Sequence, residues 1–405
     1  MLQKAPVGPG GKLEVVARYF YKSNPTIGKD RQYDGGWTEV FDAENNQTNY
    51  FYDKNDRLTG IDYLAPNGAR IKGERFYWGE PGGPDEGNLI NQAWVDAKEN
   101  VLRCKIYKYE RNNIVKESLY GNLTGQNTNF VKLDADGNIG RLNRSDCYEI
   151  TYTYSRDGFN LLRSRKEDNG TYTSFDYKEG TNLLIKKLVY VGKSLSLRHF
   201  YNYDDNATLI ETIVDDSSYN TDSKVFEKAN ERKGMSISPR KQSPGFGQKE
   251  WEDEYYYDFA TKKNKALKRT LYVYGEKDRL IRKDVYHERV KHHSVSYTYD
   301  EKGRVTKEED SRGKTWDFAY DANGNKTFSR SPSDVKTTYT YDSANRLIQE
   351  VEKSTVGTFV KQYGYDCNGN RIFSENEYGN VTDFTYDSLG RLIIIKHPSV
   401  PEVNG

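Results

Sequence analysis

One phrase of sequence recurs every 21 to 24 residues near the C-terminus of this chain. Its five copies read YTYDEKGR (297–304), FAYDANGN (318–325), YTYDSANR (339–346), YGYDCNGN (363–370) and FTYDSLGR (384–391). A fixed period of about 20–50 residues is the signature of a repeat architecture, in which each unit packs against its neighbours along the chain. The spacing therefore predicts a repeat fold.

An Asp lies three residues before a Gly in most copies. An Asp at the start of a turn can accept hydrogen bonds from nearby backbone N–H groups, and a Gly at its end adopts a positive φ without steric cost. Where Gly is absent, Asn345, Asp56 and Asp278 replace it, and these residue types tolerate a positive φ better than most. We expect the structural residues of the repeat to be Tyr52, Asp53, Tyr299, Asp300, Gly303, Tyr320, Asp321, Gly324, Tyr341, Asp342, Tyr365, Asp366, Gly369, Tyr386, Asp387 and Gly390.

A second series of turns lies between the copies of the phrase. Together the two series place a turn end every 10 to 12 residues, which leaves about six to eight residues for each strand and no room for helices. The second series runs from Asp310 to Gly313, Ser331 to Asp334, Ser354 to Gly357 and Asn376 to Gly379. The sequence thus predicts an all-β antiparallel meander with one hairpin per repeat. A β-propeller is the rival arrangement, because two units have the length of one blade.

The composition favours a single-layer sheet over a propeller. Only 35% of the residues are hydrophobic and the mean hydropathy is −0.95, yet 14% are aromatic and 34 are Tyr. Propellers bury aliphatic faces between blades, and this chain has few aliphatic residues. Aromatic pairs such as Tyr339/Tyr341 are spaced by two, so both rings lie on one face of a strand. We expect a sheet that is wet on both faces and held by a ladder of rings from hairpin to hairpin.

The repeat is regular late in the chain and degenerate earlier. We expect degenerate repeats over 1–214, regular repeats over 253–395 and a tail over 396–405. Residues 215–252 show no strand alternation and contain ERKGMSISPRKQSPGFGQ. We expect this stretch to be an inserted, exposed loop, the first site of limited proteolysis.

The phrase Tyr-Asp-x-x-Gly-Arg-Leu resembles the YD repeat of the RHS (rearrangement hotspot) family. Tyr299-Asp300, Tyr341-Asp342 and Tyr386-Asp387, with the residues after them, carry the resemblance most closely. It covers 272–395 strongly and 19–271 more loosely. The family includes bacterial polymorphic toxins, the cocoon of insecticidal toxin complexes and the teneurin cell-surface proteins. The resemblance implies a sheet that curves or spirals into a hollow shell, which in the toxins encloses a variable C-terminal effector domain.

The chain also departs from the toxin pattern. Toxin relatives close the repeat region with a segment rich in Asp-Pro, at which an aspartyl autoprotease releases the effector. No Asp-Pro dipeptide occurs in this sequence, and residues 396–405 do not resemble an effector. We therefore expect a wall segment that does not cleave itself.

The sequence offers no constellation for catalysis, a cofactor or a metal. The net charge of +1 gives no case for nucleic-acid or membrane-surface binding, and the three cysteines form no CxxC pair. Asp134 to Asn138 is better explained as a repeat turn than as a calcium loop. His292 and His293 are adjacent on a strand, so we expect their rings to point to opposite faces and not to share a metal. The five Trp residues either fill gaps on the sheet faces or stack on sugars, and their exposure decides between the two.

Two functions remain open. The first is a non-enzymatic shell segment that encloses or presents another domain, with a C-terminal effector domain or further shell segments as partners. The alternative is a cell-surface binding module for a glycan or a protein. By resemblance the chain is expected to be secreted or at the cell surface, with no membrane insertion.

Overall fold

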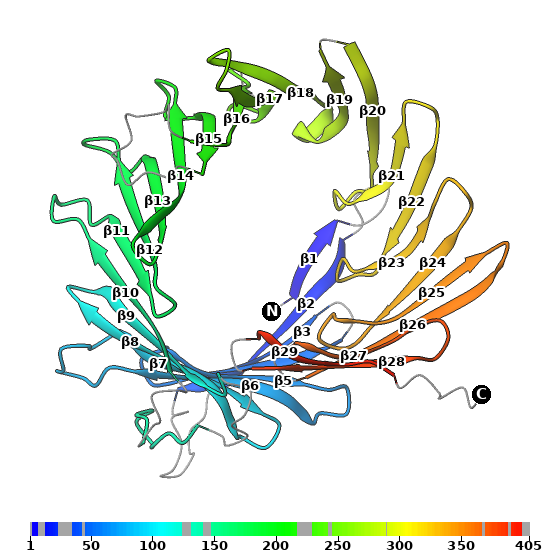
Figure 1. Cartoon of the computed structure of the whole chain (residues 1–405). Coiled ribbons are helices and arrows are strands. Elements are labelled where there is room, and N and C mark those ends of the chain that lie inside the picture. Colours follow the sequence, from blue (N-terminus) through cyan, green and yellow to red (C-terminus); the bar gives the residue numbers. More distant parts are fainter. Residues whose placement is uncertain are drawn as a thin grey trace, which may run out of the picture. The chain divides into compact units, whose positions relative to one another are not determined.

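The computed structural model describes residues 2–6, 13–22, 35–42, 45–123, 131–140, 147–216, 229–241, 245–288, 290–366, 369–387 and 390–398. Over these residues the protein is one open antiparallel sheet of 29 strands, β1 to β29 (Figure 1). The helical segment among them is a single 3-10 turn, η3 (Glu276–Asp278). The all-β prediction is therefore confirmed. No helix in this part of the chain has the length and apolar character needed to cross a membrane.

The chain divides into two compact units, and the first is built from segments that are distant in sequence. It holds residues 1–148, 300–304 and 316–405. Its strands are β1 (Leu2–Pro6), β2 (Leu13–Lys22), β3 (Gly36–Asp42), β4 (Gln47–Tyr52), β5 (Leu58–Leu64), β6 (Arg70–Trp78), β7 (Leu89–Asp96), β8 (Val101–Glu110), β9 (Asn113–Gly121), β22 (Thr315–Tyr320), β23 (Lys326–Arg330), β24 (Lys336–Tyr341), β25 (Leu347–Ser354), β26 (Gly357–Tyr365), β27 (Arg371–Glu375), β28 (Val381–Tyr386) and β29 (Leu392–Lys396).

The second unit holds residues 149–299 and 305–315. Its strands are β10 (Cys147–Tyr154), β11 (Leu162–Glu167), β12 (Thr171–Tyr177), β13 (Leu184–Val191), β14 (Ser194–Tyr203), β15 (Leu209–Asp215), β16 (Arg232–Pro239), β17 (Lys249–Asp258), β18 (Lys263–Tyr274), β19 (Leu280–His287), β20 (Val290–Tyr299) and β21 (Val305–Asp310).

The turns have the backbone geometry that the sequence indicated. Most close with a hydrogen bond from the backbone N–H of the last residue to the carbonyl of the first, as from Gly303 to Asp300 (3.0 Å), whereas at Asp278 the bond runs from Arg279 to Glu276 (3.3 Å). The last residue has a positive φ whether or not it is Gly. The values are 84° at Gly303, 94° at Gly324, 88° at Gly369, 75° at Gly390, 59° at Asn345, 59° at Asp56 and 52° at Asp278.

Each late hairpin also contains a β-bulge next to its second aromatic residue. In the β24–β25 hairpin, Thr340 pairs with Gln349 but Tyr341 pairs with Leu347, so Ile348 is an extra residue. The register shifts in the same way at Tyr299, Tyr320, Tyr365 and Tyr386. A bulge increases the local twist and changes the direction of nearby side chains. It therefore sets how the ring of one hairpin meets the next hairpin.

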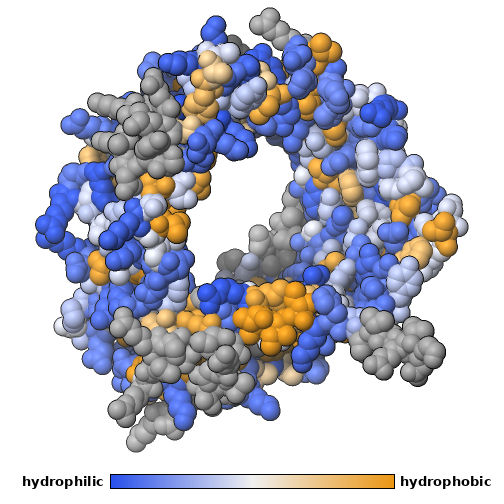
Figure 2. Space-filling view, viewed as in Figure 1, coloured by the Kyte–Doolittle hydropathy of each residue, from blue (hydrophilic) through white to orange (hydrophobic). Residues whose placement is uncertain are grey.

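The apolar core is small. In the first unit, Ala93, Cys104 and Val131 are buried together, with Tyr77 and Leu133 packed against them. Among the described residues, the largest fully buried side chains are Arg198, Asn91 and Cys104, and two of these are polar. Figure 2 shows mostly polar side chains on the visible face, with apolar ones in scattered patches. Contacts along the sheet faces, rather than a thick core, therefore hold the strands.

The expectation that residues 215–252 form one exposed loop is wrong for residues 232–239 and 249–252, which lie in strands β16 and β17. β16 pairs with β15 and with β17, and β17 begins at Lys249. The strand β16 has few apolar residues. It is stabilised instead by Arg232 at its start, which is buried against Asp215. Pro239 lies at its end, where a missing N–H is tolerated. Residues 229–231, 240–241 and 245–248 connect these strands, and 217–228 and 242–244 lie outside the described residues.

Candidate functional site

The Asp of the repeated phrase is bound inside its own turn. The backbone N–H of Arg304 donates to Asp300 Oδ1 (2.9 Å), and its Nε donates to Asp300 Oδ2 (2.7 Å). Burial alone would raise the pKa of the Asp300 carboxyl, but the hydrogen bonds from Arg304 outweigh burial and lower the pKa below its usual value. A general acid or base needs a pKa near the working pH. This carboxylate is a structural ion-pair partner instead.

The arginine that follows the turn also binds the next hairpin. Arg346 Nη1 donates to the carbonyl oxygen of Asp366 (2.7 Å), and its Cζ lies 5.0 Å from the ring centroid of Tyr365. Arg304 makes the same two contacts, with Asp321 O (2.6 Å) and the Tyr320 ring (4.9 Å). We call this pair of contacts the inter-hairpin contact.

The tyrosine of the next hairpin returns a bond to the previous one. The Tyr365 hydroxyl donates to the carbonyl oxygen of Leu347 (2.8 Å), the residue that pairs with Tyr341 beside the bulge. The same bond runs from Tyr341 to Lys326 (2.9 Å), Tyr299 to Leu280 (2.5 Å), Tyr274 to Lys249 (2.8 Å), Tyr203 to Leu184 (3.0 Å) and Tyr109 to Leu89 (2.8 Å). At Trp78 the indole Nε1 takes this role and donates to Leu58 O (2.8 Å). Successive rings are thus linked through hydroxyls, carbonyls and arginines.

Two of the five late copies carry Asn in place of the arginine. Asn325 and Asn370 keep the bond within the turn, since each Nδ2 donates to Oδ2 of the turn Asp (2.8 Å in both). A carboxamide is too short to lie over the next ring. The following residue supplies a cation instead: Lys326 Nζ is 4.7 Å from the Tyr339 ring centroid, and Arg371 Cζ is 5.4 Å from that of Phe384.

Turn residues also join distant segments of the first unit. Arg391, the last arginine of the phrase, donates from Nη2 to the carbonyl oxygen of Leu123 (2.9 Å), 268 residues earlier. Asn323 Nδ2 donates to Asp42 Oδ2 (2.8 Å) across 281 residues. Late hairpins therefore dock on early strands of the same unit through their turns.

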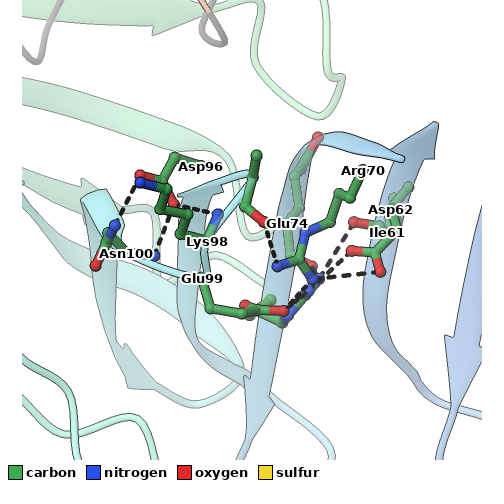
Figure 3. A network of polar contacts seen from close by, with 10 residues as sticks. Ile61, Asp62, Arg70, Glu74, Asp96, Lys98, Glu99 and Asn100 are labelled. Carbon is green, nitrogen blue, oxygen red and sulfur yellow. Dashed lines mark hydrogen bonds and ion pairs between the residues drawn. The ribbon is translucent and has the colours of Figure 1, made fainter. Parts of the chain in front are cut away.

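A network of four charged side chains lies on β5, β6 and the β7–β8 turn (Figure 3). Arg75 Nη2 donates to Asp62 Oδ1 (2.8 Å) and to Glu99 Oε1 (2.5 Å), and Arg70 Nη1 also donates to Glu99. Glu99 ends its turn with a φ of 68°, a conformation that costs a non-Gly residue about 1–2 kcal/mol. Two cations balance two anions, so the network ties strands together without an excess of charge.

A buried ion triad crosses β14, β15 and β16 in the second unit. Asp215 accepts from Arg198 Nε (2.7 Å) and Nη2 (3.0 Å), and from Arg232 Nη2 (3.1 Å). The three side chains are 0%, 1% and 6% exposed, in the order Asp215, Arg198, Arg232. Buried charges of this kind require their partners, so the triad fixes the register of three strands.

Several tyrosines donate to a glutamate on another strand, either the adjacent one or, for Tyr255, the second one along. The Tyr363 hydroxyl donates to Glu350 Oε2 (3.1 Å). Burial, and then the bond to Glu350, raise the pKa of Tyr363 to about 12. Tyr255 with Glu211 (2.6 Å) and Tyr272 with Glu252 (2.5 Å) are similar, and their pKa values are also raised. These hydroxyls stay protonated at neutral pH and act as donors.

The structure places the tryptophans in packing roles. Trp94 and Trp251 are partly buried, and each lies under an arginine, with Cζ of Arg103 or Arg269 4.6 Å from the ring centroid. Rings already covered by a cation favour the packing interpretation over sugar stacking. Asp134 accepts from the backbone N–H of Asn138 (2.8 Å) in a turn that ends at Gly137 with a φ of 79°.

The expectation for the histidine pair is wrong. The Nδ1 atoms of His292 and His293 lie 3.2 Å apart, so the two rings meet rather than point to opposite faces. The side chains do not alternate between the two faces here because a β-bulge interrupts the strand between Lys291 and His293. Within the described ranges, no group of three or more His, Cys, Asp or Glu side chains gathers in a way that suits a metal ion.

Sequence reasoning missed the inter-hairpin contact. The available signal was the residue after each turn, which is Arg or Asn in all five late copies. A side chain required only for a turn would vary freely there. Its restriction to two hydrogen-bond donors indicated the bond to the turn Asp. It did not indicate the inter-hairpin contact, because the copies with Asn keep only the bond within the turn.

Comparison with known proteins agrees with the repeat. Residues 249–400 match the family model described as the teneurin YD-shell, which confirms the resemblance to the YD-repeat family for this segment. No curated protein matches the chain. A crystal structure of TcdB2-TccC3-Cdc42 matches 87% of this chain and 19% of its own length, at 12% identity and a TM-score of 0.40. The Photorhabdus luminescens Tc holotoxin pore matches 95% of this chain and 23% of its own length, at 11% identity and a TM-score of 0.44. The chain thus spans about a fifth of the length of these structures.

Proposed function

We propose that the YD-shell segment of residues 249–400, with the degenerate repeats before it, is a non-enzymatic wall that encloses or presents another polypeptide domain. The observation that carries the proposal is the inter-hairpin contact. Arg304 and Arg346 bind the next hairpin in the same way, and the Tyr hydroxyl of the repeat binds the previous hairpin, as at Tyr341 and Tyr365. Repeated units that bind their neighbours build extended surfaces, and the turn carboxylates of Asp300 and Asp342 are held by the arginine of their own turn.

The partners of such a wall would be an effector domain, further shell segments, or both. The protein would be secreted or presented at a cell surface, as the family resemblance implies. The division into degenerate repeats (1–214) and regular repeats (253–395) belongs to this proposal, since the regular part contains most of the family match.

Protease protection tests the wall. The tagged chain is purified from its source cells with whatever polypeptide is joined to it or associated with it, and the assembly is treated with trypsin. An enclosed domain should survive in the assembly and be digested when it is produced alone. Equal digestion in both states, or no associated polypeptide at all, would contradict the proposal.

A binding module remains the second candidate because some aromatic rings are exposed. Tyr378 is 77% exposed in the turn between β27 and β28, and Phe246 is 57% exposed. Exposed rings of this kind can stack on sugars or anchor a protein partner. Saturable binding to a glycan array or to cells, lost in Tyr378→Ala but kept in Val356→Ala, would favour this function. Val356 is 82% exposed and serves as the control without a ring.

A further inference from the structure

The β19–β20 hairpin extends beyond β21, the strand that pairs with the other edge of β20 (Figure 1). Residues of β20 from Val290 to Ser296 pair with β19, but the pairing of β20 with β21 starts only at Val295. His292 and His293 therefore lie on a part of β20 with a strand neighbour on one side, and both side chains are exposed. Small molecules and ions can reach them.

His292 is the extra residue of a β-bulge. Val285 pairs with His293, and the next residue, Tyr286, pairs with Lys291. In a regular strand, consecutive side chains point to opposite faces. A bulge sets two residues opposite one and changes the direction of a side chain. The two imidazoles accordingly meet, with ring centroids 5.5 Å apart and ring planes at 82°.

The spacing of the two Nδ1 atoms suits a single metal ion. Two imidazole nitrogens, each 2.0–2.1 Å from a tetrahedral Zn²⁺, lie ~3.3–3.4 Å from one another. The two Nδ1 atoms are 3.2 Å apart. Without a metal, one Nδ1–H donates to the lone pair of the other ring. A metal ion that replaces that proton lies to one side of the line between the two nitrogens, so each ring turns to direct its lone pair at the ion.

A carboxylate lies close to the histidine pair, since Asp284 pairs with Ser294. Lys291, next to the pair, is bound to the carboxylate of Asp284, with Nζ 2.9 Å from Oδ1. The same carboxylate oxygen also lies 3.1 Å from Arg282 Nε, so it balances the charge of Lys291 only in part. The bulge thus brings two nitrogen ligands together at an accessible place, beside a lysine that is held by a carboxylate.

We propose that His292 and His293 chelate one divalent transition-metal ion through their Nδ1 atoms, with water or an incoming ligand in the remaining positions. Imidazole suits Zn²⁺, Ni²⁺ and Cu²⁺, and Cu²⁺ binds a given nitrogen site most tightly. The site is independent of the wall function, because it uses no residue of the inter-hairpin contact.

Calorimetric titration of the metal-stripped full chain with Zn²⁺ and Cu²⁺ tests the site. We expect one ion per chain at this site and at least ~10-fold weaker binding in both His292→Ala and His293→Ala. His287→Ala, which removes another exposed histidine of the same hairpin, should bind within twofold of the parent chain. Electron paramagnetic resonance of the Cu²⁺ form should show two nitrogen ligands, and one in each single variant.

A relocated pair tests the role of the bulge. Lys263 and Asn264 are adjacent and exposed on β18, and they pair with Asp258 and Tyr257 without a register shift. Introducing Lys263→His and Asn264→His into a chain that lacks both native histidines should not restore binding, because regular alternation separates the rings. Restored binding, unchanged binding in either single variant, or an equal loss in His287→Ala would overturn the proposal.

Discussion

Replacing Arg346 by Asn isolates the inter-hairpin contact from the turn. Asn is the residue at this position in two other copies, and Asn325 shows that it keeps the bond to the turn Asp. The variant loses the bond to Asp366 O and the cation over Tyr365. A hydrogen bond from a charged group contributes about 1.5–3 kcal/mol, and a cation over a ring about 0.5–1 kcal/mol. Because the Arg346 side chain is 22% exposed, we take the lower end of each range. The local free energy of opening should therefore fall by ~2 kcal/mol.

Hydrogen exchange measured by mass spectrometry is the suitable assay. A long repeat array does not unfold in one step, so a single unfolding midpoint would hide a local effect. Amide exchange reports the local opening free energy instead. A loss of ~2 kcal/mol should speed exchange in β26 and β27 by roughly 30-fold. Exchange in β12 and β13, which lie in the other unit, should not change.

Two further variants sharpen the result. Tyr365→Phe removes the hydroxyl that donates to Leu347 and should cost about 1 kcal/mol in the same peptides. Lys353→Asn removes an exposed cation from β25 and should change exchange less than twofold. The reasoning is refuted if Arg346→Asn speeds exchange less than threefold, or if Lys353→Asn has an equal effect.

Other perturbations test separate features. Ala207 ends its turn with a φ of 62°, so Ala207→Gly should raise the local opening free energy by ~1 kcal/mol, seen as slower exchange. Asp215→Asn leaves Arg198 and Arg232 buried without their counter-charge and should destabilise β14 to β16 by about 3–5 kcal/mol, measured by hydrogen exchange in those strands. The pKa of Tyr363 is about 12 in the folded chain and about 10 when unfolded. Its contribution to stability is therefore full below pH ~10 and is lost as the pH rises through the folded value. In absorbance titrations at 295 nm, the difference between the parent chain and Glu350→Gln should show one tyrosine that ionises at lower pH in the variant; identical curves would contradict the role of Glu350.

The positions of strands and turns could be predicted because they follow from local backbone preferences. Gly303, Asn345 and Asp278 differ in side chain but share a tolerance of positive φ, and a pattern of that kind is visible in one sequence. β16 was missed because its stabilisation does not come from alternating apolar residues. Its buried Arg232 needs Asp215 from another strand, and no local pattern reports such a pair.

The side-chain contacts between hairpins depend on the β-bulges, and the bulges could not be predicted from the sequence. The aromatic spacing placed Tyr341 and Tyr365 on their strands but left out the register shift beside each ring. That shift decides which carbonyl meets the next hydroxyl. The histidine pair shows the same limit, since a strict alternation of faces separated two rings that a single extra residue brings together.

The bond from Arg391 to Leu123 has a consequence for the order of folding. The 268 residues between them take on the order of 10–50 s to synthesise. Strands of the first unit leave the ribosome early but cannot gain their late partners until then. During that interval their turns and strand edges are open to wrong pairing, and refolding in solution has to close the same long loop. Slow maturation and a need for chaperones should therefore accompany this fold, even though most of its strand pairs are local.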